Sequence, residues 1–227
     1  MADCTRESRP RSYVRRGGRI TKAQRQAVTT HWESLGLPPG EPLDLDRIFG
    51  RRAPHVLEIG FGMGEVLIDA AASTPAWDFL GIDVHEPGIG RVLAAAAAAA
   101  LSNLRVLRGD AAELLPASFA ARSLDQIWVL YPDPWPKKRH HKRRLVQPAF
   151  AAELVRALRP GGRLRLATDW EDYARHMLEV LDVVEGLRNV AGPGRYCPAP
   201  QRWAESKFER RGRRLGHPIL HLSYTRA

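Results

Sequence analysis

The sequence predicts an α/β protein built on a mostly parallel sheet with helices on both faces. Short apolar runs alternate with segments of helical periodicity along most of the chain, which is the order of a βαβ series. The apolar runs are nearly continuous, as expected for strands that are buried on both faces. Hydrophobic residues make up 44% and charged residues 26% of the chain, a composition that excludes collagen-like, coiled-coil and wholly disordered proteins.

The chain has 227 residues, enough for one large domain or one domain with an appendage. A first helix is expected over residues 21–37, because the Pro-Pro-Gly that follows ends its apolar periodicity. We expect residues 1–52 to form a basic N-terminal arm with this helix, and residues 53–227 to form the main domain. In that domain we expect strands over residues 55–59, 78–84, 104–109, 124–130, 163–168 and 218–224, and helices over residues 65–73, 88–101, 147–158 and 170–185.

Positive charge is concentrated in three short stretches. The chain has 35 Lys and Arg against 25 Asp and Glu, a formal net charge of +10, and a pI near 10.3. Residues 1–27, 135–145 and 202–214 carry +6, +6 and +4, so the remaining residues together carry −6. Any one basic stretch could be a solvated loop, but three in an otherwise acidic chain predict a polyanionic partner, nucleic acid above all.

Several other classes of protein are disfavoured. The longest apolar run, residues 92–101, is ten residues of mostly alanine, whereas a membrane span needs about 20, so no membrane partner is expected. The arginine-rich N-terminus does not read as a secretory signal, which predicts a cytoplasmic location. The two cysteines, Cys4 and Cys197, form no CxxC pair, so neither a disulfide framework nor a zinc site is indicated.

A glycine-rich loop follows the first strand of the main domain. Gly60, Gly62 and Gly64 alternate between this strand and the next helix, where glycine permits a tight turn and close approach of a ligand to the helix N-terminus. The spacing G-x-G-x-G differs from the dinucleotide fingerprint G-x-G-x-x-G, which disfavours a pyrophosphate ligand. Glu58 precedes the loop, where its carboxylate would meet an ammonium.

Two more acids end the next two strands. Asp83 lies 19 residues beyond Gly64, the place at which an acid binds ribose hydroxyls, and Asp110 is placed to accept from an adenine edge. Each could instead be the N-cap of the following helix. Taken together with Glu58, they indicate a site for an adenosine that carries an amino acid, which is S-adenosylmethionine.

The loop and two other motifs resemble known methyltransferases. The order E-x-G-x-G-x-G from Glu58, an acid ending the second strand, and L-R-P-G-G at residues 158–162 resembles the class I methyltransferases. Residues 130–144, L-Y-P-D-P-W-P-K-K-R-H-H-K-R-R, resemble the signature of the tRNA (guanine-N7-)-methyltransferases. The arm at residues 11–21, the pair Thr168-Asp169 and residues 206–212 agree, so the resemblance covers nearly the whole chain.

The resemblance implies a Rossmann-like, mostly parallel seven-stranded sheet and methyl transfer from S-adenosylmethionine to N7 of a guanine in tRNA, guanine 46 of the variable loop. It also implies that Asp133 is the catalytic residue. The cofactor contacts it implies are Glu58, Asp83, Asp110 and Asp133, beside the three loop glycines. The implied tRNA or guanine contacts are Lys137, Asp169, Ser206, Lys207, Phe208 and Glu209. Two positions depart from the family pattern, which often has Glu at position 83 and Thr at position 206, but both keep the needed oxygen.

The chemistry fits these residues. Guanine N7 has a free in-plane lone pair, so its methylation needs no strong base and depends mainly on positioning. The product purine is cationic, and Asp133 or Asp169 can stabilise the developing charge. Pro132 and Pro134 would stiffen the turn that carries Asp133, and Trp135 is expected either to stack on a base or to lie in the core. No metal is expected, because methyl transfer requires none and six cations surround the only adjacent histidines, His140 and His141.

Two alternatives remain open from the sequence. One is a catalytically silent RNA-binding protein that keeps the methyltransferase fold, although its site would then be expected to lose some of its four acids. The other is a methyltransferase that acts on a small molecule or a protein, which the segregated positive charge disfavours. The oligomeric state is not indicated by any pattern.

Overall fold

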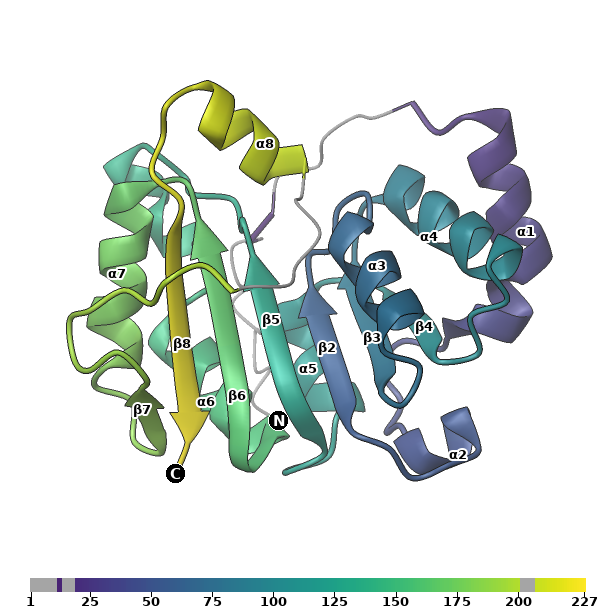
Figure 1. Ribbon diagram of the computed structural model, residues 1–227, viewed down its shortest axis with the longest axis horizontal. Helices are drawn as coiled ribbons and strands as arrows, with labels where there is room; N and C mark the ends of the chain where they lie inside the picture. Colours follow the sequence, from purple (N-terminus) through teal and green to yellow (C-terminus); the bar gives the residue numbers. More distant parts are fainter. Residues whose placement is uncertain (1–11, 14–18, 201–206) are drawn as a thin grey trace, which may run out of the picture.

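A computed structural model describes residues 12–13, 19–200 and 207–227. The described chain forms an eight-stranded sheet in the order β1-β4-β3-β2-β5-β6-β8-β7 (Figure 1). Pairing is parallel from β1 through β6, and β8 is antiparallel to both β6 and β7. The strands are β1 (Gly36–Leu37), β2 (His55–Ile59), β3 (Asp78–Asp83), β4 (Leu104–Arg108), β5 (Leu124–Leu130), β6 (Leu158–Thr168), β7 (Leu187–Asn189) and β8 (Leu220–Arg226). The prediction of a mostly parallel α/β sheet is confirmed, but the sheet has eight strands rather than the seven that the resemblance implies, because the two-residue β1 joins its edge beside β4.

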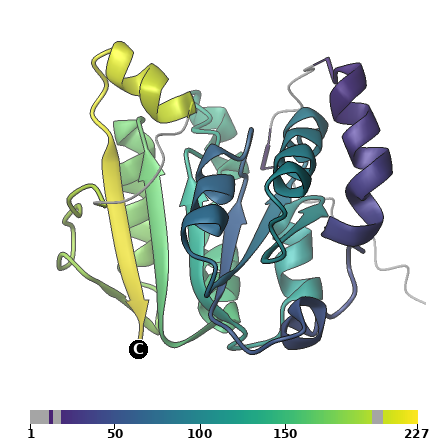
Figure 2. The same cartoon turned by 45° about the vertical axis from the view of Figure 1, so that its right-hand side comes forward.

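Helices cover the sheet in two layers (Figures 1 and 2). One layer holds α1 (Lys22–Leu35), α3 (Glu65–Ser73) and α4 (Glu86–Ala98). The other holds α5 (Ala111–Ser118), α6 (Pro148–Ala157) and α7 (Glu171–Leu181). Three shorter pieces complete the chain. The helix α2 (Leu45–Phe49) lies near the amino ends of the parallel strands and α8 (Lys207–Arg214) above their carboxyl ends (Figure 1), and the 3-10 helix η1 (Lys138–Arg143) follows β5 in the sequence.

Successive side chains of the central strands supply the two layers in turn. In β2, Leu57 and Ile59 pack with α5, α6 and α7, whereas Val56 packs with α3 and α4. In β3, Leu80 and Ile82 face the first of these cores and Phe79 the second. Every residue of β2 and β3 is buried. The nearly continuous apolar runs in the sequence therefore have the physical cause expected, namely burial on both faces.

Several elements differ from the sequence expectations. Periodicity does not predict α5, a short helix with Pro116 inside it, nor the two-residue β1 that joins the sheet edge beside β4. The first helix begins and ends inside the expected 21–37 range, because Gly36 and Leu37 form β1. The glycine turn at residues 158–162 is continuous with β6: Leu158 pairs with Leu124, and pairing resumes at residue 163 after an irregularity. The division at residue 52 stays a prediction.

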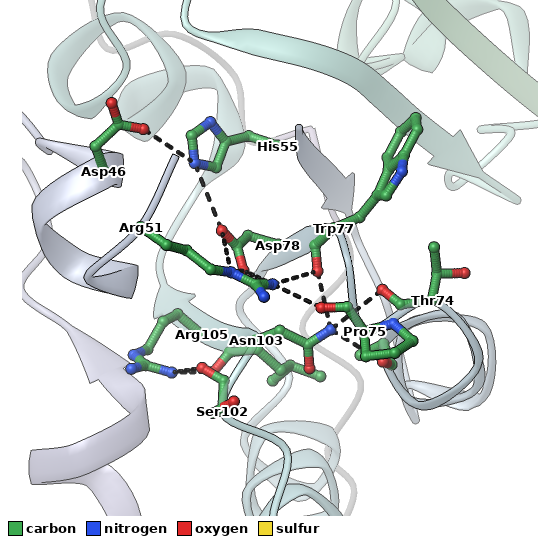
Figure 3. A network of polar contacts seen from close by, with 12 residues as sticks. Asp46, Arg51, His55, Thr74, Pro75, Trp77, Asp78, Ser102, Asn103 and Arg105 are labelled. Atoms are coloured by element: carbon green, nitrogen blue, oxygen red, sulfur yellow. Dashed lines mark hydrogen bonds and ion pairs between the residues drawn. The ribbon is translucent and has the colours of Figure 1, made fainter. Parts of the chain in front are cut away.

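The two ends of the parallel strands form distinct edges. The carboxyl ends of β2, β3, β5 and β6 point toward α8, which lies above this edge in Figure 1. At the opposite edge, where β2 and β3 begin, Arg51 and Asp78 centre a network of polar contacts (Figure 3). No helix in the described ranges has both the length and the apolar character needed to cross a membrane.

Candidate active site

The glycine loop between β2 and α3 is a tight turn. Gly60, Gly62 and Gly64 have φ angles of +75°, +57° and +73°, in the left-handed region that side chains disfavour. The loop is also approached closely by the start of α4. A Cβ added to Gly88 would lie 1.7 Å from the Gly62 carbonyl oxygen, so this contact requires glycine. Gly60, in contrast, is exposed, and a Cβ there would meet nothing within 4 Å, so the loop is open at its first glycine.

Asp83, at the end of β3, fixes this loop. Its carboxylate accepts hydrogen bonds from the Gly62 N–H at 2.6 Å and from the His85 N–H at 2.8 Å. Burial raises the pKa of Asp83, and these backbone donors oppose the rise. The N-cap of α4 is His85, so Asp83 does not cap that helix. Each of its oxygens keeps a second lone pair, which a ribose hydroxyl can use.

Glu58 is a buried acid beside the loop, only 3% exposed. Its Oε2 has no hydrogen-bond partner among the residues that the structure describes. Burial, followed by the charges of Asp83 and Glu65, raises the pKa of Glu58 to about 8. A carboxyl group so placed is costly unless a cation or donor meets it. The amino group of S-adenosylmethionine is such a cation, so the residues present fit this cofactor.

Asp110 follows β4 and caps α5. Its Oδ1 accepts from the Ala112 N–H at 2.9 Å, the helix-cap interaction that the sequence left open as an alternative. The same oxygen accepts from the Ser12 hydroxyl at 3.4 Å. Its contact with adenine therefore stays a prediction, and a residue of the N-terminal arm lies beside it.

Asp133 lies in a strained turn after β5. Tyr131 and Trp135, on either side of Pro132-Asp133-Pro134, have φ angles of +53° and +48°. Such conformations cost roughly 1 kcal/mol or more for a residue with a side chain, and persist where surrounding contacts impose them. The Tyr131 N–H donates to the Ala167 carbonyl at 2.8 Å, which ties the turn to β6. Asp133 itself is half-buried.

Trp135 closes the other side of this turn. Its indole N–H donates to the Ser12 carbonyl at 3.2 Å, so the arm lies against it. The Arg143 guanidinium lies 5.0 Å from the ring centroid, and His140 meets the ring edge-on at 5.8 Å. The ring is half-buried, so it is not part of the core. Its stacking on a base stays a prediction.

Helix α8 brings a further acid to the carboxyl edge. A Cβ at Gly212 would lie 3.1 Å from Cβ of Asp169, so α8 packs directly on the residue that follows β6. Glu209, paired with Arg213 at 2.7 Å, contributes with burial to raising the pKa of Tyr131. The helix therefore places Glu209 near Tyr131 and close to the turn that carries Asp133.

An ion pair joins α8 to the glycine loop. Arg210 Nη2 lies 3.8 Å from Oε1 of Glu65, the first residue of α3. The same Glu65 oxygen is 3.5 Å from Arg91 of α4. Sequence reasoning missed Glu65 and Arg210, because ion pairs between distant segments leave no local pattern. The two sides of the site, glycine loop and α8, are thus connected.

The remaining candidates lie at the rim or outside the described residues. Lys137 is exposed just before η1. Ser206 falls outside the described residues, and so do the side chains of Lys207 and Phe208, although their backbone begins α8. In the parts of the chain that the structure describes, no cluster of three His, Cys, Asp or Glu side chains is arranged to hold a metal ion.

The sheet order aligns the predicted acids. Asp110, Asp83, Glu58, Asp133 and Asp169 lie at or just beyond the carboxyl ends of β4, β3, β2, β5 and β6, which is their order across the sheet. Ligands of open α/β sheets bind in the crevice at this edge. The fold and this edge together define a class I methyltransferase.

Comparison with known proteins agrees. The methyltransferase family model Methyltransf_4 matches residues 52–222. A tRNA (guanine-N(7)-)-methyltransferase of Alkalilimnicola ehrlichii is 52% identical over 227 residues, covering 98% of this chain and 95% of that protein. The protein of the same name from Leifsonia xyli subsp. xyli is 53% identical, covering 95% of each. The chain therefore belongs to the S-adenosylmethionine-dependent tRNA (guanine-N(7)-)-methyltransferase family, as its motifs predict.

Solved structures support the fold alone. The 16S rRNA methyltransferase KamB superposes with a TM-score of 0.62 at 20% identity, covering 85% of this chain and 98% of that chain. TrmN from Thermus thermophilus gives a TM-score of 0.53 at 22% identity, covering 81% of this chain and 47% of that one. Both likenesses agree with the class I methyltransferase sheet described above.

Proposed function

We propose that this protein transfers the methyl group of S-adenosylmethionine to N7 of a guanine in tRNA, guanine 46 of the variable loop by the family resemblance. The observation that carries the proposal is the row of acids along one sheet edge, in a chain about half identical to curated tRNA (guanine-N(7)-)-methyltransferases over nearly its whole length. The acids are distributed over five neighbouring strands, so an extended ligand can contact several of them at once.

The cofactor half of the site lies over β2, β3 and β4. Glu58 would hold the amino group, because its buried carboxyl group has an oxygen without a partner in the described chain. Asp83 would accept ribose hydroxyls while it keeps the Gly62 N–H in place. Asp110 would face the adenine from the start of α5. When bound, S-adenosylmethionine supplies a methyl group activated by the positive sulfur.

The guanine half lies over β5 and β6. Asp133 and Asp169 would accept hydrogen bonds from guanine N1–H and the 2-amino group, donors that adenine does not present. Guanine N7 forms the new bond to the methyl carbon, and the electrons of the breaking carbon–sulfur bond pass to sulfur. No proton leaves N7, so the carboxylates position the base and stabilise its developing positive charge. The strained turn at Asp133 supports this positioning role.

Basic segments surround this half and suit tRNA phosphates. The side chains of Lys137, Lys138, Arg139 and Lys142 are exposed in and beside η1. Ser12, from the predicted basic arm, contacts both Asp110 and Trp135. An RNA that meets the arm and η1 together would therefore be held next to both halves of the site. A cytoplasmic location and the absence of a membrane partner stay predictions.

The decisive experiment combines the purified protein, unmodified tRNA and labelled S-adenosylmethionine. Borohydride reduction followed by aniline cleaves the strand at 7-methylguanine, and we expect cleavage at a single variable-loop guanine. No label in tRNA, with S-adenosylmethionine still bound, would favour the silent RNA-binding alternative or another acceptor. A chelator is expected to leave transfer intact, and loss of activity that added metal restores would contradict the metal-free proposal.

A further inference from the structure

Arg144 differs from the other cations of its basic segment. Its side chain is 2% exposed, whereas Lys138, Arg139 and Lys142 are exposed residues. By sequence alone all of them belong to one positive stretch suited to phosphates. Burial removes Arg144 from the surface that a phosphate backbone can reach, so its charge must serve a contact within the protein.

The partners of Arg144 lie on two different elements. Its Nε donates to the Pro134 carbonyl at 3.0 Å, in the turn that carries Asp133. Its Nη2 donates to the Asp172 carboxylate, in the first turn of α7. The guanidinium lies 5.0 Å from the ring centroid of Tyr173, which is fully buried. One planar side chain thus connects the turn to the helix that follows β6.

The remainder of this connection is also ordered by hydrogen bonds. The backbone N–H of Arg144 donates to the His141 carbonyl at 3.0 Å, and the backbone N–H of Val146 donates to the Tyr173 hydroxyl at 3.2 Å. The Gln147 side chain donates to the same His141 carbonyl at 2.9 Å. These contacts fix the backbone on both sides of Arg144, so its guanidinium has a defined position relative to Pro134.

The turn at Asp133 needs such a support. Prolines on both sides of Asp133 limit its backbone, and the left-handed conformations of Tyr131 and Trp135 are costly. Pro132 and Pro134 have no N–H to donate. The Pro134 carbonyl is an acceptor immediately after Asp133, and Arg144 satisfies it with a charged donor, the stronger kind of hydrogen bond.

We propose that Arg144 is a positioning residue for Asp133 and does not contact RNA. It acts on Asp133 through its hydrogen bond to the Pro134 carbonyl. Asp172 on α7 binds the guanidinium, and the ring of Tyr173 packs against it. The kinetic test of this inference rests on the proposed methyl transfer. The test of whether Arg144 contacts RNA does not. The planar guanidinium bridges two acceptors and an aromatic ring, which a lysine ammonium does not reproduce.

The experiment compares Arg144→Lys with Arg139→Lys, two substitutions that keep the charge of the segment. At saturating S-adenosylmethionine, Arg144→Lys should lower kcat about tenfold or more, with the KM for tRNA and the salt slope of tRNA binding unchanged. Arg139→Lys keeps a positive point charge at an exposed position of the same segment, so it is the comparison for tRNA affinity and for the salt slope rather than for kcat. A second pair of variants, Arg144→Ala and Arg139→Ala, should differ in the salt dependence of tRNA binding. Only Arg139→Ala should flatten the slope of log binding constant against log salt concentration, by about 0.7 to 0.9 for the loss of one phosphate contact.

Asp172→Asn tests the same arrangement from the helix side. It removes the negative charge that pairs with Arg144 without substituting any residue of the basic segment, so kcat should fall while tRNA binding is kept or strengthened. His141, 3.7 Å from the same carboxylate, loses that charge as well. Thermal denaturation shows whether each variant is folded. If the Arg144 variants are unfolded, the kcat of Asp172→Asn tests the positioning role.

Two outcomes would overturn the proposal. One is a flatter salt slope for Arg144→Ala, and the other is an unchanged kcat for both Arg144→Lys and Asp172→Asn. The salt slope is measured by tRNA binding alone. It therefore tests whether Arg144 contacts RNA even if the wild-type protein methylates no tRNA. Failure of the proposed methyl transfer and failure of the proposed role of Arg144 are then distinguishable.

Discussion

Glu58 and Asp78 are buried carboxyl groups on neighbouring parallel strands, and they differ in their partners. Asp78 begins β3, is 0% exposed, and receives two donors of Arg51, at 2.6 Å and 3.0 Å. Arg51 also donates to the Pro75 and Trp77 carbonyls, and Asn103 closes the network beside it (Figure 3). Glu58, near the other end of β2, has a buried oxygen with no such donor within the described residues.

This contrast separates a structural polar site from a binding site. At the amino edge of the sheet the protein itself supplies the counter-charge, so burial of Asp78 is compatible with stability. At the carboxyl edge one oxygen of Glu58 has no partner among the described residues and the turn at Asp133 is strained, two costs that folding alone does not explain. The proposed binding of a cationic ligand would account for the first cost, and the proposed placement of Asp133 for the second.

The largest effect is expected at the structural edge. Arg51→Ala leaves the buried Asp78 carboxylate without this partner. Because the Arg51 side chain is itself 40% exposed, the loss should lie near the lower end of the range for breaking a buried pair, about 3 kcal/mol. Denaturant unfolding should show this loss, with S-adenosylmethionine affinity retained where the protein is folded. Arg52→Ala is the matched control: Arg52 is exposed and only 3.5 Å from the exposed Asp46, a contact worth about 0–1 kcal/mol. Equal losses for the two variants would contradict the structural importance of the Arg51–Asp78 pair.

The next effect concerns catalysis at the other edge. Asp133→Ala should lower kcat by about 100- to 1,000-fold, the usual loss when one transition-state-stabilising group is removed. The free energy of unfolding should change little, since the side chain is half-buried and the prolines remain. Single-turnover methylation of tRNA measures the rate, and equilibrium binding of S-adenosylmethionine should change far less than the rate. Unchanged turnover would remove Asp133 from the site.

Glu58→Gln sharpens the comparison from the opposite side. The substitution keeps the shape and removes an acid that the folded, ligand-free protein must hold protonated above pH 4.5, so the free energy of unfolding at neutral pH should stay the same or rise. Loss of a charge-assisted hydrogen bond to the amino group should weaken S-adenosylmethionine binding by about 1.5–3 kcal/mol. Calorimetric titration measures this, with Glu113→Gln, an exposed acid of α5, as control. Equal affinity of Glu58→Gln and wild type would show that Glu58 does not meet the cofactor.

Much of the fold was predictable because its core strands are buried on both faces. Strands such as β2 and β5, with five and seven mostly apolar residues, are specified by their own residues. In contrast, β1 and β7 have two and three residues, too few to carry a pattern, and they form because a neighbouring strand offers backbone partners. Helix α8 has one large apolar residue, Phe208, among strongly charged neighbours, so no repeat of apolar residues reveals it.

The candidate site was predictable where residues act locally. Glycines in a loop and acids at strand ends leave a local signature, and the topology gathers them at one edge. Arg144 carried no such signature: in the sequence it is one of six cations, and only its contact with Pro134 and Asp172 separates it from the rest. The capping role of Asp110 was open from the sequence for the same reason, since it depends on where α5 begins.

The effect that is smallest per pH unit is a pH dependence that only the carboxyl edge should show. Burial raises the pKa of Glu58 from an ordinary 4.5 to about 8, so between these values the folded protein holds a proton that the unfolded chain has lost. Stability of the ligand-free protein should therefore fall as pH rises through this window. An ammonium ligand binds the carboxylate and expels that proton, so affinity for S-adenosylmethionine should rise by at most about tenfold per pH unit. The rise should end near pH 8, roughly where an α-amino group begins to lose its own proton.

Calorimetry in buffers of different ionisation enthalpy counts the protons released. We expect nearly one proton per S-adenosylmethionine at pH 6 for the wild-type protein and for Glu113→Gln, and none from this position for Glu58→Gln. Release of the same number of protons by Glu58→Gln would assign the titration to another group, with Asp83 the first candidate because burial raises its pKa as well. The comparison of the two edges then reduces to one measurable difference: the acid at the carboxyl edge gives up a proton when its ligand arrives, whereas Asp78 already has its counter-charge in Arg51.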